Sequence, residues 1–371
     1  MAVPGLSGSN GGVSSNQVEL PTSELNYLSL KNKYSIPLDV SYFINNECNL
    51  KCKHCYVGYN NIENHLTLAE WEKLFEELID LGALTFGNVG KEPTLAWDKT
   101  IHLLKFLRAK RKQLEKIRFG LVTNGILLDN NKINVLNEIE PDYVDISLDG
   151  DRETHDIVRG KGTFDKLIKN LDIISNTKLL DNIFIIFTIN KLTINNISNT
   201  IKFLDDLGIK NILLSPYITI KKNDPLYISN SEFCNLFRSI KNGSLIDFNK
   251  YSNLTIYIKN DFSTTSQLMS DMVSSKIIEL DNLLIDDYGV IFNKFRMGSN
   301  NLIFSYIPFN NNYKQLLRFS HDGYLSTCLD MFYCNYSERA IGNVRSSSIS
   351  NLLNNINLKP IGLKEIETTC F

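Results

Sequence analysis

Short apolar runs alternate along this chain with stretches in which apolar residues recur every three or four positions. Apolar runs bounded by polar turns predict strands. Such runs lie at Leu38–Ile44, Ala83–Val89, Ile117–Thr123, Tyr143–Leu148, Ile183–Ile189 and Ile212–Tyr217. Between them the period of a helix predicts helices over residues 67–81, 97–113, 130–139, 163–176 and 193–207.

The first predicted helix shows how the sequence sets such boundaries. Thr67 and Glu70 have the spacing of a capping box, in which each side chain accepts a hydrogen bond from the other residue's backbone N–H. Leu74 and Leu78 then fall on one face, and Gly82 ends the pattern. We therefore expect a helix with a defined start and one buried face.

Strands that alternate with helices predict right-handed βαβ units and a parallel sheet, hence the α/β class. The alternation alone fits an open barrel and a doubly wound sheet equally well. In both architectures the carboxyl ends of the strands form the working face. Functional residues are thus expected directly after the predicted strands.

Changes in pattern divide the chain into four parts. The first is rich in Gly, Ser and Asn and is expected to be flexible. The second carries the alternation, the third mixes helix and strand signals without a repeat, and the last contains Asp322-Gly323, a hairpin turn signal. The predicted boundaries are 1–34, 35–220, 221–315 and 316–371.

Composition narrows the classes of function. The chain has 39 Lys and Arg against 41 Asp and Glu, so a net charge of −2 offers no basic surface for nucleic acid or an anionic membrane. No apolar run approaches the ~20 residues of a membrane-spanning helix, and no basic and apolar secretory signal opens the chain. We expect a cytoplasmic protein with no membrane or nucleic-acid partner.

The most distinctive chemistry follows the first predicted strand. Cys48, Cys52 and Cys55 stand in the run Glu-Cys-Asn-Leu-Lys-Cys-Lys-His-Cys-Tyr. Three thiolates at this C-x3-C-x2-C spacing can hold one face of a [4Fe-4S] cluster, since such clusters are bound by cysteine thiolates. Three ligands for four irons leave one iron open to a small chelating molecule, as catalytic metal sites generally do.

A structural zinc site and disulfide bonds are the two other uses of these cysteines. A structural zinc site would need a fourth ligand, and His54 and His65 are near in sequence, but zinc sites usually add a second Cys or His pair downstream. Disulfides are disfavoured by the odd count of seven cysteines in a chain without a signal peptide. Zinc therefore stays open as the alternative to a cluster.

The triad followed by Tyr56 resembles the signature of the radical S-adenosylmethionine (radical SAM) family. In that family the open iron binds the amino and carboxyl groups of SAM. Reductive cleavage of SAM then yields a 5′-deoxyadenosyl radical that abstracts hydrogen from the substrate. The resemblance implies an oxidoreductase with a partial (β/α)6 barrel and a small α+β C-terminal extension. It also implies a reductant such as flavodoxin or ferredoxin.

Later strand ends extend the resemblance. Gly90-Lys91-Glu92-Pro93 is similar to the family's Gly-Gly-Glu-Pro motif, in which Glu receives the SAM α-ammonium. Lys91 replaces the second glycine, which matters if that position needs a positive φ. The segment 147–164 resembles the Ser-Leu-Asp-Gly … His-Asp … Arg-Gly … Gly-x-Phe run of peptide maturases and sulfatase-maturating enzymes. The SAM-binding residues implied are Tyr56, Glu92, Asn124, Ser147, Arg159 and Asn190, with an apolar wall near Leu214.

Within that segment the resemblance implies that Arg159 binds the carboxylate of SAM, because a guanidinium can donate two parallel hydrogen bonds to a carboxylate. His155-Asp156 has the form of an acid–base pair. Consecutive His and Asp residues at such a position more often order a loop and cap the next helix. We expect the structural role.

The late cysteines resemble the start of a SPASM or Twitch extension, which binds auxiliary iron–sulfur clusters. A complete SPASM domain needs more cysteines than the three after residue 300, Cys328, Cys334 and Cys370. One auxiliary cluster held by these three is expected, with Cys234 or a substrate atom as fourth ligand; the alternative is buried packing thiols. Cys234 also has two other roles open to it, as a hydrogen donor to a substrate radical or as a core residue.

Three functions follow from these patterns. The first is a maturase that crosslinks a ribosomally made precursor peptide, which would be its partner. The second is a radical SAM dehydrogenase or epimerase of a small molecule. The third, from a different class, is a zinc-binding adaptor without catalysis.

Overall fold

The structure is a computed structural model, and it describes a large part of the 371-residue chain. The described residues are 38–55, 57, 64–217, 219, 223–260, 271–279, 282, 284–285, 290–306, 316–326 and 340–354. The expectations for residues 1–34 and for Tyr56, Cys328, Cys334 and Cys370 lie outside these ranges.

The predicted alternation of strands and helices is confirmed, with boundaries that differ by a few residues. Its elements are β1 (Leu38–Phe43), α2 (Leu68–Asp80), β2 (Ala83–Gly90), α3 (Trp97–Arg111), β3 (Arg118–Thr123), α4 (Asn130–Ile139), β4 (Tyr143–Ser147), α5 (Arg152–Arg159), α6 (Thr163–Ser175), β5 (Ile183–Ile189), α7 (Ile197–Asp206) and β6 (Asn211–Pro216). The helix α5 was not predicted, because it is only two turns long.

Further elements follow in the less regular part of the sequence. They are α8 (Asn230–Lys241), β7 (Thr255–Asn260), β8 (Leu284–Ile285), β9 (Ile291–Met297), β10 (Asn300–Tyr306), β11 (Leu316–Phe319), β12 (Tyr324–Ser326), β13 (Gly342–Asn343) and α11 (Ile349–Asn354). Their strands extend the sheet at both ends.

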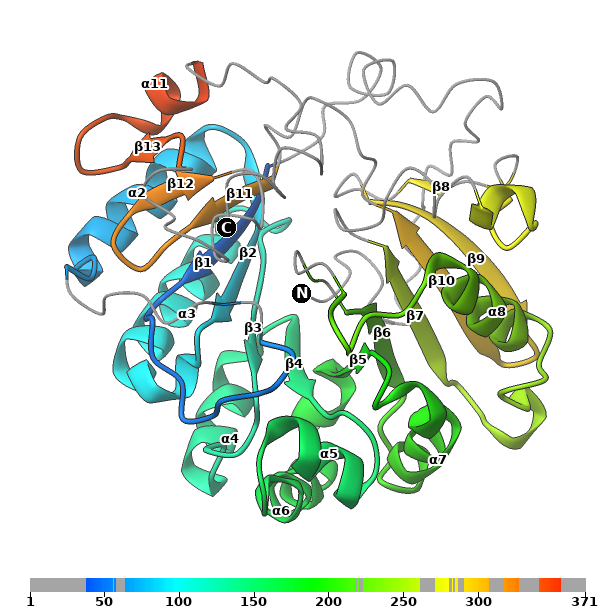
Figure 1. The fold of residues 1–371 in the computed structure, drawn as a ribbon. Coiled ribbons are helices and arrows are strands. Elements are labelled where there is room, and N and C mark those ends of the chain that lie inside the picture. The colour runs from blue at the N-terminus through cyan, green and yellow to red at the C-terminus, as the bar shows by residue number, and fades with distance from the viewer. Residues whose placement is uncertain are drawn as a thin grey trace.

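All described strands form one mixed sheet. Their order is β13-β12-β11-β1-β2-β3-β4-β5-β6-β7-β10-β9-β8. Strands β1 to β7 run parallel in chain order, so the sheet lacks the reversal of strand order that marks a doubly wound fold. Figure 1 shows the sheet curving, with α2 to α8 on its outer side. The α/β class is confirmed, whereas the (β/α)6 barrel, the separate extension and the four-part division stay predictions.

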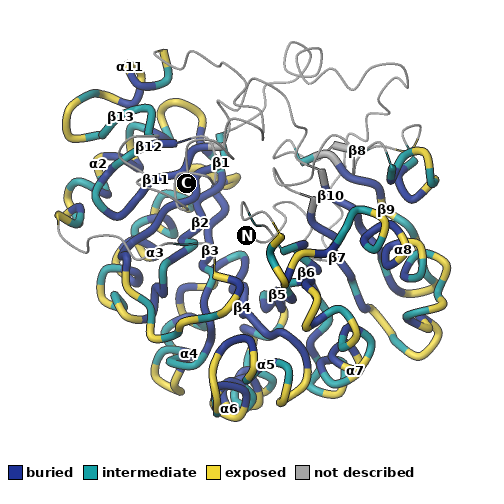
Figure 2. The backbone as a smooth tube through the Cα atoms, in the orientation of Figure 1, coloured by how far each residue is buried: buried dark blue, intermediate teal, exposed yellow. Residues whose placement is uncertain are grey.

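Residues on the two faces of each strand pack in different layers, since side chains alternate along a strand. On β4, Val144 and Ile146 are fully buried in the core between sheet and helices. Tyr143 packs in a smaller cluster on the inner face, with Phe184 and Tyr257. Figure 2 shows the strands mostly buried and the exposed residues mainly on the outer helices and loops. Each fully buried apolar side chain contributes about 1.5–3 kcal/mol.

Local signals read from the sequence are present in the structure. The capping box forms, with the Thr67 backbone N–H donating to Glu70 Oε2 at 2.7 Å and the Glu70 N–H to Thr67 Oγ1 at 3.2 Å. The hairpin turn also forms between β11 and β12, with Gly323 at a φ of 92°. Strand β11 pairs in parallel with β1, which is the strand that precedes the cysteine triad.

Candidate active site

A cavity of about 230 Å³ opens at the carboxyl ends of the parallel strands. Its wall combines the loop after β1 with the ends of β2 to β7, which is where the strand–helix pattern predicted functional residues. The lining residues are Cys48, Leu50, Cys52, His54, Cys55, Val57, Val89, Lys91, Glu92, Val122, Thr123, Asn124, Ser147, Arg159, Ile186, Thr188, Ser215, Pro216, Tyr217 and Lys259.

The three cysteines of the triad reach this cavity as free thiols. Cys48 and Cys52 are half-buried and Cys55 is exposed. The Leu50 backbone N–H donates to Cys48 Sγ at 3.4 Å, and Nη1 of Arg159 lies 3.9 Å from Cys52 Sγ. Burial raises the pKa of the Cys52 thiol to about 11, so a bound cation is what would favour its thiolate.

This donor set fits a cluster better than a single zinc ion. Within the described ranges, no three His, Cys, Asp or Glu side chains are grouped closely enough to share one metal ion. The nearest candidate for a fourth zinc ligand, His54, turns its Nε2 toward Asp149 Oδ2 at 3.2 Å. In a [4Fe-4S] cluster each thiolate binds a different iron, so the three sulfurs need only line one cavity.

Glu92 is buried beside the triad, with 1 % of its surface exposed. Its Oε1 accepts hydrogen bonds from the backbone N–H and the hydroxyl of Thr94 and from the Thr123 hydroxyl, while Oε2 accepts one from the Asn124 N–H. Burial raises the pKa of Glu92, and these hydrogen bonds oppose that rise. Oε2 accepts only one of these four hydrogen bonds, so it can accept another from a ligand.

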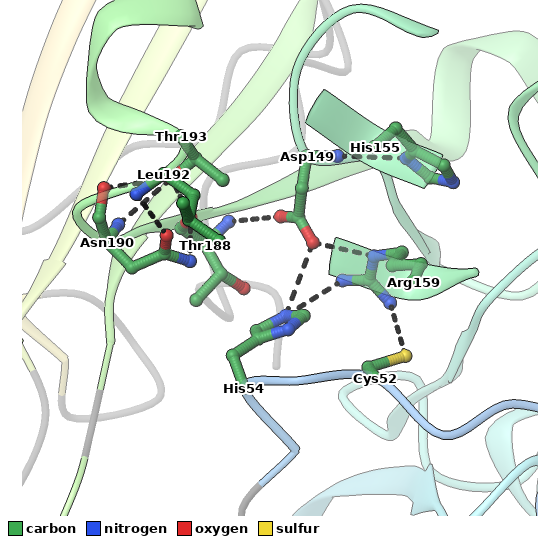
Figure 3. Close-up of polar contacts among 9 residues, drawn as sticks. All are labelled: Cys52, His54, Asp149, His155, Arg159, Thr188, Asn190, Leu192 and Thr193. Carbon is green, nitrogen blue, oxygen red and sulfur yellow. Dashed lines mark hydrogen bonds and ion pairs between the residues drawn. The ribbon is translucent and has the colours of Figure 1, made fainter. Parts of the chain in front are cut away.

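Asp149 connects the cysteine loop to α5 and β5, as Figure 3 shows. Its Oδ2 accepts from Arg159 Nε at 2.6 Å and pairs with His54, and its Oδ1 accepts from the Thr188 N–H at 2.8 Å. Burial opposes ionisation of Asp149, but the charges of Arg159 and His54 more than offset it and hold its pKa well below its usual range. The carboxylate therefore orients both neighbours.

The structural role expected of His155-Asp156 is confirmed. Asp156 accepts hydrogen bonds from the N–H groups of Gly162 and Phe164, at 2.6 and 2.9 Å, and so fixes the start of α6. His155 Nδ1 accepts the Asp149 N–H at 3.2 Å. Burial and the charge of Arg159 lower the pKa of His155 to about 4, so it stays neutral near pH 7.

Other predicted residues lie at varied distances from the cavity. Asn124 and Ser147 line it, and Asn124 Nδ2 donates to Asn49 Oδ1 at 2.8 Å in the cysteine loop. Asn190 is buried after β5, where its Oδ1 accepts the Leu192 N–H at 2.9 Å, and it does not line the cavity (Figure 3).

Cys234 lies on α8, in the core between helix and sheet, with 5 % of its surface exposed. It does not line the cavity. Its placement agrees with the core residue that the sequence left open, and neither a cluster ligand nor a hydrogen donor is needed to account for it.

Several residues of the site were missed. Asp149 was seen only as part of a turn, and Lys259 was not singled out, although the alternation in Thr-Ile-Tyr-Ile-Lys-Asn places it on the inner face with Tyr257. Lys91 was noted only as a replaced glycine. It does not have a positive φ; the positive φ in this turn belongs to Gly90, at 150°.

Comparison with known proteins identifies the part of the chain that forms this site. Residues 42–204 match the family described as the Radical SAM superfamily. This part of the chain is a radical SAM domain. Radical SAM proteins use a [4Fe-4S] cluster and SAM, and the convergence of the three cysteines and Glu92 fits both.

Curated relatives match part of the chain. The chain is 34% identical to Fe-coproporphyrin III synthase of Methanosarcina barkeri over 168 residues. The matched residues are 44% of this chain and 40% of that protein. It is 28% identical over 149 residues to the antilisterial bacteriocin subtilosin biosynthesis protein AlbA of Bacillus subtilis, 39% and 32% of the two chains. The matches thus span well under half of these relatives.

Solved structures share the fold over most of the chain. Streptococcus suis SuiB bound to SAM covers 91% of this chain and 72% of its own, with a TM-score of 0.63 and 15% identity. SuiB bound to its precursor peptide SuiA covers 93% and 73%, with the same TM-score and identity. At this identity the likeness shows the fold alone. Through the described ranges, the structure has no helix long and apolar enough to cross a membrane.

Proposed function

We propose that this chain is a radical SAM oxidoreductase that abstracts hydrogen from a ribosomally synthesised precursor peptide and so modifies or crosslinks it. The observation that carries the proposal is the convergence of Cys48, Cys52 and Cys55 with Glu92 and Arg159 on one cavity. The triad would hold the cluster. When bound, the cluster and SAM supply one-electron chemistry that ends in hydrogen abstraction.

The chain's own side chains would bind and orient SAM. Glu92 Oε2 offers an acceptor for the α-ammonium, and its four internal hydrogen bonds fix its position beforehand. Arg159 is held by Asp149 through Nε, and its Nη groups, which contact Cys52 Sγ and His54 Nε2, would also meet a carboxylate in the cavity. Ser147 and Asn124 line the cavity and would add polar contacts. Tyr56 and Asn190 belong to the proposed set by the family resemblance alone.

Apolar side chains between these groups would keep water from the reacting atoms. Val89, Val122 and Ile186 line the cavity between the polar strand ends. Removing water strengthens the electrostatic contacts inside such a site and limits side reactions. The Thr188 and Ser215 hydroxyls on β5 and β6 face the same space and are suited to a polar substrate group.

A peptide substrate is supported by the relatives. AlbA is by name a bacteriocin biosynthesis protein, and SuiB was solved with a precursor peptide. The segment 147–164, which resembles peptide maturases, supplies Asp149 and Arg159 to the site. The proposal retains the partial (β/α)6 barrel, the Twitch or SPASM-like extension and a reductant such as flavodoxin or ferredoxin.

The test is reductive SAM cleavage by anaerobically reconstituted protein. The wild type should release 5′-deoxyadenosine, and the variant with Cys48, Cys52 and Cys55 all changed to Ala should not. With its true peptide, the enzyme should give a product two daltons lighter if a crosslink forms, by loss of two hydrogens. Undiminished 5′-deoxyadenosine from the triple variant would refute the site, and one tightly bound zinc per chain in place of iron and sulfide would favour the adaptor.

A further inference from the structure

Lys91 stands in the cavity wall beside the cysteines, at the position where the related motif has a glycine. Its backbone is fixed to the loop that enters the triad. The Lys91 N–H donates to the Asn45 carbonyl at 2.9 Å, and the Glu92 N–H donates to the Glu47 carbonyl at 2.9 Å. The Asn45 side chain in turn donates to the Glu92 carbonyl at 2.9 Å. Three hydrogen bonds thus hold Lys91 against the segment just before Cys48.

The charge of Lys91 acts on the triad. Partial burial lowers the pKa of Lys91, while the thiolates of Cys55 and Cys48 act in the opposite direction. Burial raises the pKa of the Cys48 thiol; the hydrogen bond from the Leu50 N–H and, to a lesser extent, the charge of Lys91 oppose the rise, while Glu92 adds to it. Arg159 acts in the same direction on Cys52, and its Nη1 lies 3.9 Å from Cys52 Sγ. Both cations also act on Cys55.

We propose that Lys91 sets how readily the cluster accepts its reducing electron. Its ammonium favours the reduced state of the cluster that the triad binds, and so raises the cluster's reduction potential. The proposal rests on the proposed function, because it requires the cluster. The physical reason is that an added electron increases the negative charge of the cluster, and a nearby cation stabilises that charge. Net charge and solvent exposure are among the factors that set such potentials.

Lys91 and Arg159 differ in their surroundings. The Arg159 guanidinium is paired with the buried Asp149, so its charge is largely compensated. The Lys91 side chain lines the cavity together with all three cysteines. Changing Lys91 should thus alter the field at the cluster more than it alters folding.

The experiment compares midpoint potentials without SAM or substrate. Wild type, Lys91→Met, Lys91→Gly, Lys91→Arg and Lys53→Met are reconstituted anaerobically with iron and sulfide, and their iron and sulfide contents are measured. Each is then titrated with dithionite in the presence of mediators, and the one-electron reduced cluster is followed by electron paramagnetic resonance. Lys53→Met is the matched control, because Lys53 is an exposed lysine of the same loop that does not line the cavity.

Loss of the charge should move the midpoint potential of Lys91→Met and Lys91→Gly to more negative values, at unchanged iron content. Lys91→Arg should stay near wild type, and Lys53→Met should shift less because water and salt screen an exposed charge. Raising the ionic strength should reduce the Lys53 shift more than the Lys91 shift.

The proposal is overturned if both neutral Lys91 variants keep the wild-type potential, or if Lys53→Met shifts as far as they do. It is also overturned if both neutral variants lose the cluster, which would make Lys91 an assembly residue; if only Lys91→Met loses it, Lys91→Gly decides. A wild type that takes up no iron and sulfide contradicts the proposed function itself. A wild-type cluster whose potential ignores Lys91 contradicts the inference alone.

Discussion

At the scale of single residues, the site is organised by carboxylates that are already paired before any ligand arrives. Asp149 is fully buried and holds Arg159 and His54, two side chains from distant parts of the chain. Glu92 is held by donors from β3 and from the turn after β2. Such preorganisation means that binding does not have to pay for ordering these groups.

The Asp149–Arg159 pair can be tested through stability. Asp149→Asn and Arg159→Met each leave one charge buried without its partner, which should lower the free energy of unfolding of the cluster-free protein by about 3–5 kcal/mol. The double variant should lose less than the sum, because it leaves neither charge unpaired. Urea unfolding of the four proteins measures this. Strict additivity would show that the pair does not interact.

Glu92→Gln tests the acceptor for the SAM ammonium. An amide keeps the size of the side chain but removes the charge and presents a donor to groups that already donate. SAM affinity should fall by about 1–3 kcal/mol, roughly 5- to 150-fold, with the iron content unchanged. Calorimetric titration of reconstituted protein with SAM measures the change. Unaltered affinity would mean that the likeness of the Gly-Lys-Glu-Pro run to the family motif does not extend to its ligand.

At the scale of elements, a clamp joins the segment before α11 to the start of α2. Arg345 Nε and Nη2 donate to the two carboxylate oxygens of Glu70 at 2.6 and 3.0 Å. Its Nη1 and Nη2 also donate to the carbonyls of Asn64 and His65. One guanidinium thus fastens the C-terminal part of the described chain to the residues that lead from the cysteine loop into α2.

This clamp predicts a pH dependence of stability. The hydrogen bond from Arg345 is the largest cause that lowers the pKa of Glu70 from 4.5 to about 2. A depressed folded-state pKa contributes stability that is present above pH 4.5 and is lost as the pH falls toward 2. The difference in unfolding free energy between wild type and Glu70→Gln should therefore be greatest above pH 4.5 and shrink below it. The effect will be modest, since both side chains are more than a third exposed.

Acid unfolding curves of the two proteins, recorded between pH 7 and pH 2, supply the measurement. Glu76→Gln is a suitable control, because Glu76 also carries an ion pair on α2, with Lys110 in place of Arg345. A gap between wild type and Glu70→Gln that stays constant with pH would show that the clamp acts through packing rather than charge.

At the scale of the whole molecule, periodicity predicted β1 to β6 and their helices because each is encoded within a few residues. Relations between distant residues were not accessible in this way. The Arg159–His54 contact joins residues 105 positions apart, and Arg318 reaches Ser41 across 277. Lys259 was missed because β7 lies where the strand–helix repeat has ended. The likeness of short motifs to a known family supplied what periodicity alone did not.

The number of clusters is a prediction for the entire chain. If Cys328 and Cys334 bind an auxiliary cluster, the reconstituted wild type should hold about eight irons per chain. The triple triad variant and a Cys328→Ala, Cys334→Ala variant should each hold about four. The second variant should still cleave SAM without substrate. Iron and sulfide analysis gives the answer directly, and a fully reconstituted wild type with only four irons would leave the late cysteines as packing residues.

The two strands that flank β1 are synthesised at different times. Strand β2 follows within a few dozen residues, but β11, the other neighbour, includes Arg318, which is 277 residues beyond Ser41. At about 5–20 residues per second, roughly 15–55 s pass during translation before that strand emerges. For this interval the nascent chain presents an open sheet edge beside its cysteine loop, and open edges invite pairing with other chains. Protection of the strand before the cysteine loop thus depends on a strand that is made much later.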